Sequence, residues 1–263
     1  MVPALMILLG VPGHIAVGTG LAVMFFNSSF GMYRRRGSGT VDFNLAVTLA
    51  SGSVFGVVLG LWIMELLKAM RPLVILGKEQ SPVQYILLCL FLLLLALIAV
   101  VMFFDLNRNS GRAPEKRIGL FAKIKMPPFV CFSSLEEPKV SLIPIILLGF
   151  GVGMLTGLLG VGGGIVMMPA LVYLIGQRTP KAAGTSLALV WISSLAAVAG
   201  HISAGNLHPR LMCAMMAGGI IGTGIGTHIG LKLAGPKIRR YFIYILALAV
   251  LIVAVKLWRM TFA

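Results

Sequence analysis

The sequence is poor in charged residues, and poorest in acidic ones. Only 11% of its 263 residues are charged, with 7 Asp or Glu against 22 Lys or Arg, and 59% are hydrophobic. A soluble domain would carry roughly 25% charged residues, so most of this surface is not expected to face water. Apolar runs of about 20 residues, long enough to cross a hydrocarbon core of roughly 30 Å, recur along the chain. The fold class predicted is therefore an all-α polytopic membrane protein.

Sequence signatures of metal, redox and hydrolytic chemistry are missing. The three cysteines, Cys89, Cys131 and Cys213, are far apart and form no CxxC or Cys/His spacing, which argues against a disulfide framework or a zinc site. The sequence contains no HExxH and no Walker motif. A serine nucleophile requires a His partner. Ser186 lies in an apolar run, and the nearby spans contain no such His. We expect no enzyme activity, no metal and no cofactor.

The net charge of +15 is distributed in short basic clusters between the apolar runs, as in Arg34, Arg35, Arg36 and Lys237, Arg239, Arg240. Such clusters are typical of loops that stay on the cytoplasmic side of a membrane and contact anionic lipid headgroups. A nucleic-acid surface would interleave basic and aromatic residues on one face, and no such face is visible. The expected partner is the lipid bilayer, not nucleic acid.

The sequence matches itself without gaps at an offset of 166 residues. The matches pair Pro3-Ala4-Leu5 with Pro169-Ala170-Leu171, Gly18-Thr19 with Gly184-Thr185, Ser28 with Ser194, Gly39 with Gly205, and Gly52, Gly56, Gly60 with Gly218, Gly222, Gly226. Matched Pro, Thr and four-spaced Gly over some 60 residues indicate a duplication. We therefore predict a first transmembrane repeat at 1–104, an extramembrane loop at 105–140 and a second repeat at 141–263.

The two copies differ at their starts. The second copy is preceded by a glycine-rich run, 157–164, whereas the first copy begins at the position that matches Met167. We expect the first repeat to lack the corresponding half-helix and its glycine tip.

The segment 141–176 is predicted to be broken. The other apolar runs predict helices at about 14–33, 41–67, 83–104, 180–200, 207–233 and 241–258. As one helix, the 36 residues of 141–176 would be about 54 Å long, well beyond the hydrocarbon core. Three consecutive glycines disfavour a continuous helix, and non-helical backbone at membrane depth survives only inside protein or beside a water-filled cavity. Two shorter helices joined at the glycines are therefore expected.

The loop charges favour one topology. If 141–176 crosses the membrane, the 22 Lys and Arg split 13 to 9 between the two sides, and if it enters and returns, they split 16 to 6. The second arrangement agrees better with the excess of positive charge in cytoplasmic loops. It also makes the two repeats inverted, each with a Gly-broken half-helix segment.

Two motifs resemble a known family. The run Gly149–Leu171, with Gly160-Val161-Gly162-Gly163-Gly164 and a downstream Pro169, and the run Ala182-Ala183-Gly184-Thr185-Ser186-Leu187 are similar to the sulfite and organosulfonate exporters called TauE/SafE. Two features depart from the pattern: the first glycine-rich motif is missing, and Gly20 follows Gly18-Thr19 where the family has Ser. The resemblance implies a multi-pass transporter of small sulfur-containing or organic anions in a bacterial inner membrane.

The residues predicted to bind this anion lie at the glycine run and in two spans. Gly162, Gly163 and Gly164 would free backbone N–H groups at the start of a half-helix, where an anion is favoured; the alternative is close helix packing. Polar side chains could add donors, although such groups more often bond to their own helix. These are Thr19, Asn27, Thr185, Ser186 and Ser193.

The glycine ladders at 52–60 and 218–226 are predicted to be helix-packing faces. The predicted function is a secondary transporter and exporter, with an anion channel or a membrane subunit of a larger complex as the alternative, and homo-oligomers are allowed. The sequence leaves the anion and the coupling ion open.

Overall fold

The computed structural model describes residues 2–69, 73–75, 78–80, 82–108, 119–124, 126–132, 135, 139–160, 163–233 and 235–262. Within these residues seven helices are long and apolar enough to cross a membrane. They are α2 (Gly13–Arg34), α3 (Phe43–Ala69), α4 (Pro82–Arg108), α5 (Leu142–Leu159), α7 (Thr179–Ser203), α8 (Pro209–Lys232) and α9 (Gly235–Phe262). The prediction of an all-α polytopic membrane protein is confirmed.

The remaining elements are short. They are α1 (Val2–Leu8), the 3₁₀ turn η1 (Leu120–Lys123), α6 (Gly164–Ala170), the π-helical turn η2 (Leu171–Ile175), and the strands β1 (Leu73–Ile75), β2 (Lys78–Gln80), β3 (Phe129–Cys131) and β4 (Lys139–Ser141). Antiparallel pairing joins β1 to β2 and β3 to β4. The paired strands β3 and β4 lie at the end of the segment 105–140, where the sequence patterning predicted only a loop, and β4 extends to Ser141.

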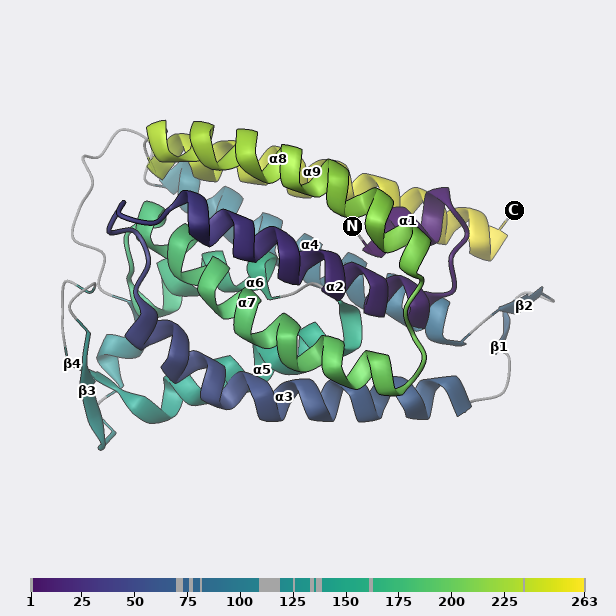
Figure 1. The fold of residues 1–263 in the computed structure, drawn as a ribbon, viewed down its shortest axis with the longest axis horizontal. Coiled ribbons are helices and arrows are strands. Elements are labelled where there is room, and N and C mark those ends of the chain that lie inside the picture. The colour runs from purple at the N-terminus through teal and green to yellow at the C-terminus, as the bar shows by residue number, and fades with distance from the viewer. Residues whose placement is uncertain are drawn as a thin grey trace.

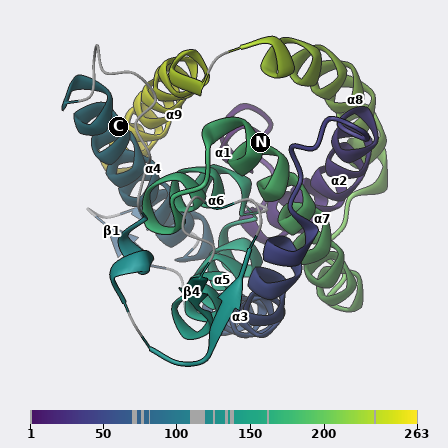
Figure 2. The ribbon, with the colours of Figure 1, turned by 90° about the vertical axis from the view of Figure 1, so that its left-hand side faces the viewer.

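The helices α2 and α7 form an antiparallel pair, which lies between α8 and α3 in Figure 1 and on the right-hand side of the bundle in Figure 2. Phe25 of α2 stacks on Trp191 of α7 with ring centroids 5.9 Å apart. A Cβ on Gly31, further along α2, would lie 3.3 Å from Leu187, which is earlier in α7. The residue numbers of the contacts thus increase along α2 while they decrease along α7, so the two helices are antiparallel.

The helices α3 and α5 pack with their backbones in direct contact. A Cβ on Gly52, Gly56 or Gly60 would overlap a backbone carbonyl of α5, and one on Gly149, Gly153 or Gly157 would overlap a carbonyl of α3. The residue numbers of the contacts increase along both helices in the same direction, so α3 and α5 are parallel. Only glycine permits this approach, and the ladder of α3 is a packing face as predicted.

The second ladder does not pack within the described chain. Among the described residues, no atom lies within 4 Å of the Cβ position at Gly218, Gly222 or Gly226. The prediction of a packing face on α8 is therefore wrong for the chain as described, although Gly219, on another side of the helix, is packed against Asn27 of α2.

The predicted break in 141–176 is confirmed. The helix α5 ends at Gly160, whose φ is 66°, and α6 starts after Gly163, whose φ is 73°. Left-handed backbone of this kind is accessible to glycine without strain. The arm that follows the break, α6 and η2, ends at Ile175. A Cβ on Gly119 would overlap the carbonyl carbon of Ile175. Figure 1 shows that α5 starts at this same end of the bundle, beside β3 and β4. The segment 141–176 therefore enters the bundle and returns to the same end. The side of the membrane on which that end lies stays a prediction.

Candidate functional site

The turn between α5 and α6, residues 160–164, is named here the glycine hinge. It is one of two features that could bind an anion. A Cβ on Gly163 would lie 2.9 Å from Cγ1 of Val152 and 3.3 Å from Oγ1 of Thr156, in addition to the strain of its positive φ. A Cβ on Gly164 would lie 3.3 Å from Cγ2 of Val190 on α7. Gly162, the third predicted residue, lies outside the described residues. Side chains of α5 and α7 thus lie close to the Cβ positions of Gly163 and Gly164.

Ser193 lies one turn after Val190 in α7. It is 1% exposed, and its hydroxyl donates to the carbonyl of Val190 at 3.4 Å, one turn back in α7. Thr156, fully buried, donates to the carbonyl of Val152 at 2.8 Å. The structure therefore places Gly164 against Val190, one turn before Ser193 in α7, and the hydroxyl of Ser193 bonds to its own helix.

Thr185 bonds to the loop that precedes α3. Its Oγ1 accepts hydrogen bonds from the backbone N–H of Asp42 at 3.1 Å and from Nε2 of Gln177 at 3.1 Å. The preceding Gly184 packs so closely that a Cβ there would overlap the carbonyl oxygen of Thr40. We call this the Thr185 contact: Gly184 and Thr185 hold the loop between α2 and α3.

Thr19 makes the corresponding contact with the loop that precedes α8. Its Oγ1 accepts a hydrogen bond from the backbone N–H of His208 at 3.0 Å, and a Cβ on Gly18 would overlap the carbonyl oxygen of Asn206. Each partner in this Thr19 contact is 166 residues from its counterpart in the Thr185 contact. Because α2 and α7 are antiparallel, the two threonines lie toward opposite ends of the pair and not in one site.

The two remaining predicted residues lie elsewhere. Ser186 is 6% exposed and donates to the carbonyl of Ala183 at 3.1 Å, within its own helix. Asn27 lies against Gly219 of α8, and its Oδ1 is buried without a hydrogen-bond partner among the described residues. The predicted set is therefore dispersed over the hinge, the two loop contacts and the α2–α8 interface.

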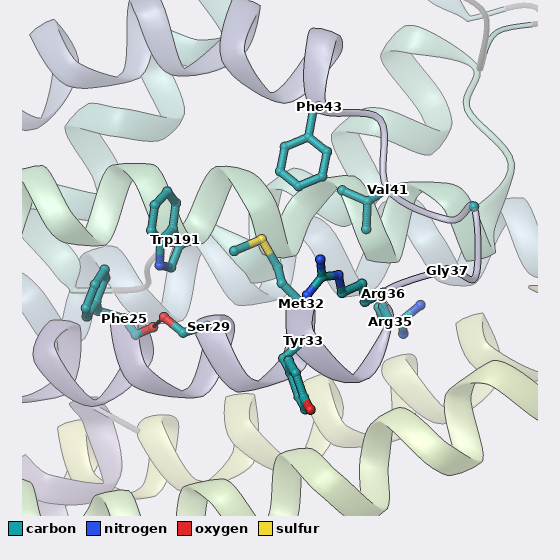
Figure 3. Close-up of a pocket in the computed structure, with 11 residues that line it drawn as sticks. Phe25, Ser29, Met32, Tyr33, Arg35, Arg36, Gly37, Val41, Phe43 and Trp191 are labelled. Atoms are coloured by element: carbon teal, nitrogen blue, oxygen red, sulfur yellow. Dashed lines mark hydrogen bonds between the residues drawn. The ribbon is translucent and has the colours of Figure 1, made fainter.

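The second candidate feature is a cavity that the sequence did not predict. It has a volume of about 850 Å³, within the range of small-molecule pockets, and lies where α2 ends and α3 begins (Figure 3). Its walls are mainly apolar, with Phe25 and Trp191 at one end and Val41 and Phe43 across from Met32, as Figure 3 shows. Two arginines, Arg35 and Arg36, also line it.

Arg35 is a buried residue that lines this cavity and whose side chain reaches toward α8. It is 8% exposed, and its Nη2 lies 3.6 Å from the Cβ position of Gly230 on α8. Among the described residues no carboxylate forms an ion pair with it, and its Nε is buried without a hydrogen-bond partner. Burial lowers the pKa of the guanidinium, which nevertheless stays protonated as arginine does in proteins. A buried guanidinium with an open donor suits an anion with two oxygens to share.

Sequence reasoning missed Arg35 because it placed Arg34, Arg35 and Arg36 together in a solvated loop. Arg34 and Arg36 are exposed, as that reasoning expected, and only Arg35 is buried. It caps α2, and the turn after Arg34 directs it toward α8. No periodicity distinguishes three consecutive arginines, so no sequence signal could have selected this one.

The comparisons with known proteins agree with the membrane architecture. The profile described as "Sulfite exporter TauE/SafE" matches residues 1–254. The "Probable membrane transporter protein YjnA" of Bacillus subtilis is 25% identical over 253 residues, covering 96% of this chain and 88% of its own length. A "Probable membrane transporter protein" of Xylella fastidiosa is 26% identical over 261 residues, covering 98% of this chain and 85% of its own length.

No solved structure gives a significant match. The family profile covers nearly the whole chain, and the seven apolar helices and the hinge fit a multi-pass transporter. The chain belongs to the sulfite exporter TauE/SafE family of membrane transporters.

Proposed function

We propose that this transporter exports small sulfur-containing or organic anions, such as sulfite or organosulfonates, across a bacterial inner membrane. We further propose that the cavity at Arg35 admits the anion from the cytoplasm. The observation that carries the proposal is Arg35 itself, a buried guanidinium without a carboxylate partner among the described residues, at the wall of a cavity of about 850 Å³.

The charge distribution supports a cytoplasmic position for this cavity. In the re-entrant arrangement, 16 of the 22 Lys and Arg belong to the end that carries Arg35. Clusters of Lys and Arg near the ends of spans favour the cytoplasm. They would also raise the local concentration of anions at the mouth of the cavity, because a field of one sign attracts the opposite charge.

The hinge supports a path beyond the cavity. Broken helices near the middle of the membrane are a recurring substrate site in transporters. The glycines at 163 and 164 leave backbone N–H groups at the start of α6 uncovered by side chains of their own. In this proposal Arg35 selects for negative charge, and the hinge region receives the anion next, with Ser193 as a further donor.

Exchange in proteoliposomes tests the role of Arg35. Purified protein would be assayed for counterflow of labelled sulfite, thiosulfate, sulfoacetate, taurine and simple carboxylates, with and without a pH gradient. Loss of a hydrogen bond to a charged group costs about 1.5–3 kcal/mol, so Arg35→Gln should lower the apparent affinity by about 10-fold or more. Arg34→Gln, one residue away and exposed, is the matched control and should change it by less than about 2-fold.

The outcomes separate the candidates. Saturable exchange that depends on Arg35 supports a carrier, whereas single-channel currents would indicate a channel instead. Undiminished exchange by correctly folded Arg35→Gln would remove the cavity from the mechanism. Gly163→Leu tests the second step in the same assay, and normal transport by that variant would remove the hinge.

A further inference from the structure

His201 is an ionisable side chain enclosed in the bundle, at the end of the α2–α7 pair opposite Arg35. It is 0% exposed, and no other ionisable side chain among the described residues is fully buried. Its Nδ1 lies 3.0 Å from Nδ2 of Asn206, which is itself 2% exposed. The pair is shielded from water, so any change in its charge must be accommodated by the surrounding protein.

Lys68 fixes the orientation of the Asn206 amide. Nζ of Lys68 lies 2.8 Å from Oδ1 of Asn206. An ammonium group only donates hydrogen bonds, so the amide atom that it meets is the oxygen, and the NH2 group of the amide faces the ring of His201. Nδ1 is thus the acceptor, and the proton of the neutral imidazole is on Nε2. A second proton on this ring is added at Nδ1.

A proton at Nδ1 would break this arrangement. Both nitrogens of a histidine cation are donors, so Nδ1 could no longer accept from Asn206. Turning the amide around would offer its oxygen to His201 but would direct its NH2 group at Lys68, which is also only a donor. In either orientation one of the two cations loses its amide partner.

The other charged groups near His201 do not replace that partner. The groups that act on it electrostatically are Lys68 and Glu65 of α3 and His14 of α2. Glu65 pairs with Lys68 at 2.7 Å, so its carboxylate is already engaged by a cation. His208, in the loop between α7 and α8, is exposed and caps α8 through its own Nδ1. The bond at Nδ1 of His201 is therefore the contact that a proton changes.

Asn206 holds the loop between α7 and α8 against the α2–α7 pair. Its backbone N–H donates to the carbonyl of His201 at 2.9 Å, and its own carbonyl oxygen occupies the space beside Gly18. Two residues further on, the N–H of His208 donates to Thr19 at 3.0 Å. Loss of the side-chain bond would therefore weaken the Thr19 contact.

The Thr185 contact has no corresponding proton-dependent bond. Arg35 matches His201 at the 166-residue offset, and an arginine in a protein keeps its proton. Thr40, which matches Asn206, bonds to Ser38 through its hydroxyl at 2.7 Å. The same loop arrangement thus carries a permanent cation at one end and a titratable ring at the other.

We infer that His201 is a proton-binding site, and that a proton on its Nδ1 releases the loop between α7 and α8 from the α2–α7 pair. By this release, protons control the end of the transport path opposite the Arg35 cavity. The control of transport rests on the proposed function, whereas the proton site itself does not.

Backbone amide exchange in detergent micelles measures the release of the loop. Exchange would be followed from about pH 8 to about pH 5, where histidine titrates and aspartate stays ionised, and corrected for the intrinsic effect of pH. One linked proton changes an equilibrium by at most about 10-fold per pH unit, so the amide of His208 should exchange at least about 3-fold faster in acid. The amide of Asp42, which bonds to Thr185, is the matched control and should not change. No acceleration at His208, or an equal one at Asp42, would overturn the inference.

Variants assign the proton to His201. His201→Asn keeps an acceptor close to the position of Nδ1 but does not titrate, so the acceleration should disappear. His208→Asn retains a side chain that caps a helix, and His14→Gln removes the histidine of α2, so both should respond as the parent does. Acceleration that persists in His201→Asn, or that is lost in His208→Asn, would place the proton elsewhere and overturn the assignment.

Counterflow of labelled sulfoacetate at equal pH on both sides tests the control of transport. Unlike sulfite, sulfoacetate does not gain a proton between about pH 8 and about pH 5. The parent should exchange it at least about 3-fold faster at the lower pH, whereas His201→Asn should show a flat profile. A profile of His201→Asn equal to that of the parent would overturn the control of transport by His201. Acid release of the loop without any counterflow would instead remove the proposed function and leave the proton site supported.

Discussion

The Thr19 and Thr185 contacts use the same interactions at opposite ends of the α2–α7 pair. In each, a glycine admits a loop carbonyl and the following threonine accepts a loop N–H. The residue whose N–H is accepted also caps the next helix. Asp42 accepts from the N–H of Leu45 at 3.0 Å, and His208 accepts from the N–H of Leu211 at 3.3 Å. Such capping satisfies a donor that the helix start would leave unpaired.

The side chains around these contacts make the two ends different. Beyond the Thr19 contact, Asn206 accepts from Nζ of Lys68 at 2.8 Å and donates to Nδ1 of His201 at 3.0 Å. His201 lies in the last turn of α7 and is fully buried. Beyond the Thr185 contact, the matching position is Arg35, at the cavity. One backbone arrangement thus supports a polar network at one end and a basic cavity at the other.

Substituting the contact glycines should have the largest effect. A Cβ at Gly184 or Gly18 would overlap a loop carbonyl oxygen, which cannot move without displacing the loop. Overpacking typically costs 1–3 kcal/mol, and we expect about 3 kcal/mol for Gly184→Val and for Gly18→Val. SDS titration of the purified protein, followed by circular dichroism, measures this. Gly151→Val is the control, because no described atom lies within 4 Å of its Cβ position. A loss equal to that of the control would show that neither loop is held.

The threonines should rank according to the donors that they satisfy. Thr185 accepts two hydrogen bonds and Thr19 accepts one. A buried donor left unpaired costs about 1–3 kcal/mol, so Thr185→Val should lose about 2–3 kcal/mol and Thr19→Val about 1–2 kcal/mol. Valine keeps the shape of threonine, which limits packing effects. Thermal unfolding in detergent, monitored by tryptophan fluorescence, gives the order, and the reverse order would mean that the ends are held differently.

His201→Phe tests whether His201 and Arg35, which match at the 166-residue offset, have different roles. The variant keeps a ring but removes the acceptor for Asn206, so stability should fall by about 1–2 kcal/mol. The apparent affinity in the counterflow assay should stay within about 2-fold of the parent, in contrast to Arg35→Gln. A larger loss of affinity than for Arg35→Gln would place substrate recognition at the opposite end.

Lys68→Met should have the smallest effect. Lys68 pairs with Glu65 at 2.7 Å, but their side chains are 22% and 52% exposed, and exposed pairs contribute about 0.2–1 kcal/mol. We expect a loss below about 1 kcal/mol in the same unfolding assay, with Lys256→Met for comparison. A loss as large as that of His201→Phe would show that the network depends on the lysine.

The sequence by itself determined the membrane class, the spans and the break in 141–176. These follow from the length of apolar runs and from consecutive glycines, which act locally on the helix regardless of what packs nearby. The 166-residue offset in the sequence also aligned the two sets of contact residues. From the sequence, Thr19 and Thr185 were predicted to be substrate ligands. The sequence could not show which distant loop each threonine contacts.

Only the tertiary structure decided the burial of Arg35 and the occupancy of each glycine ladder. Arg35 is one of three consecutive arginines, and it alone is buried, with its Nη2 3.6 Å from the Cβ position of Gly230 on α8. The ladders of α3 and α8 have the same spacing, and they differ because α5 covers the first while no described residue covers the second. Packing depends on which elements meet, and local pattern does not carry that information.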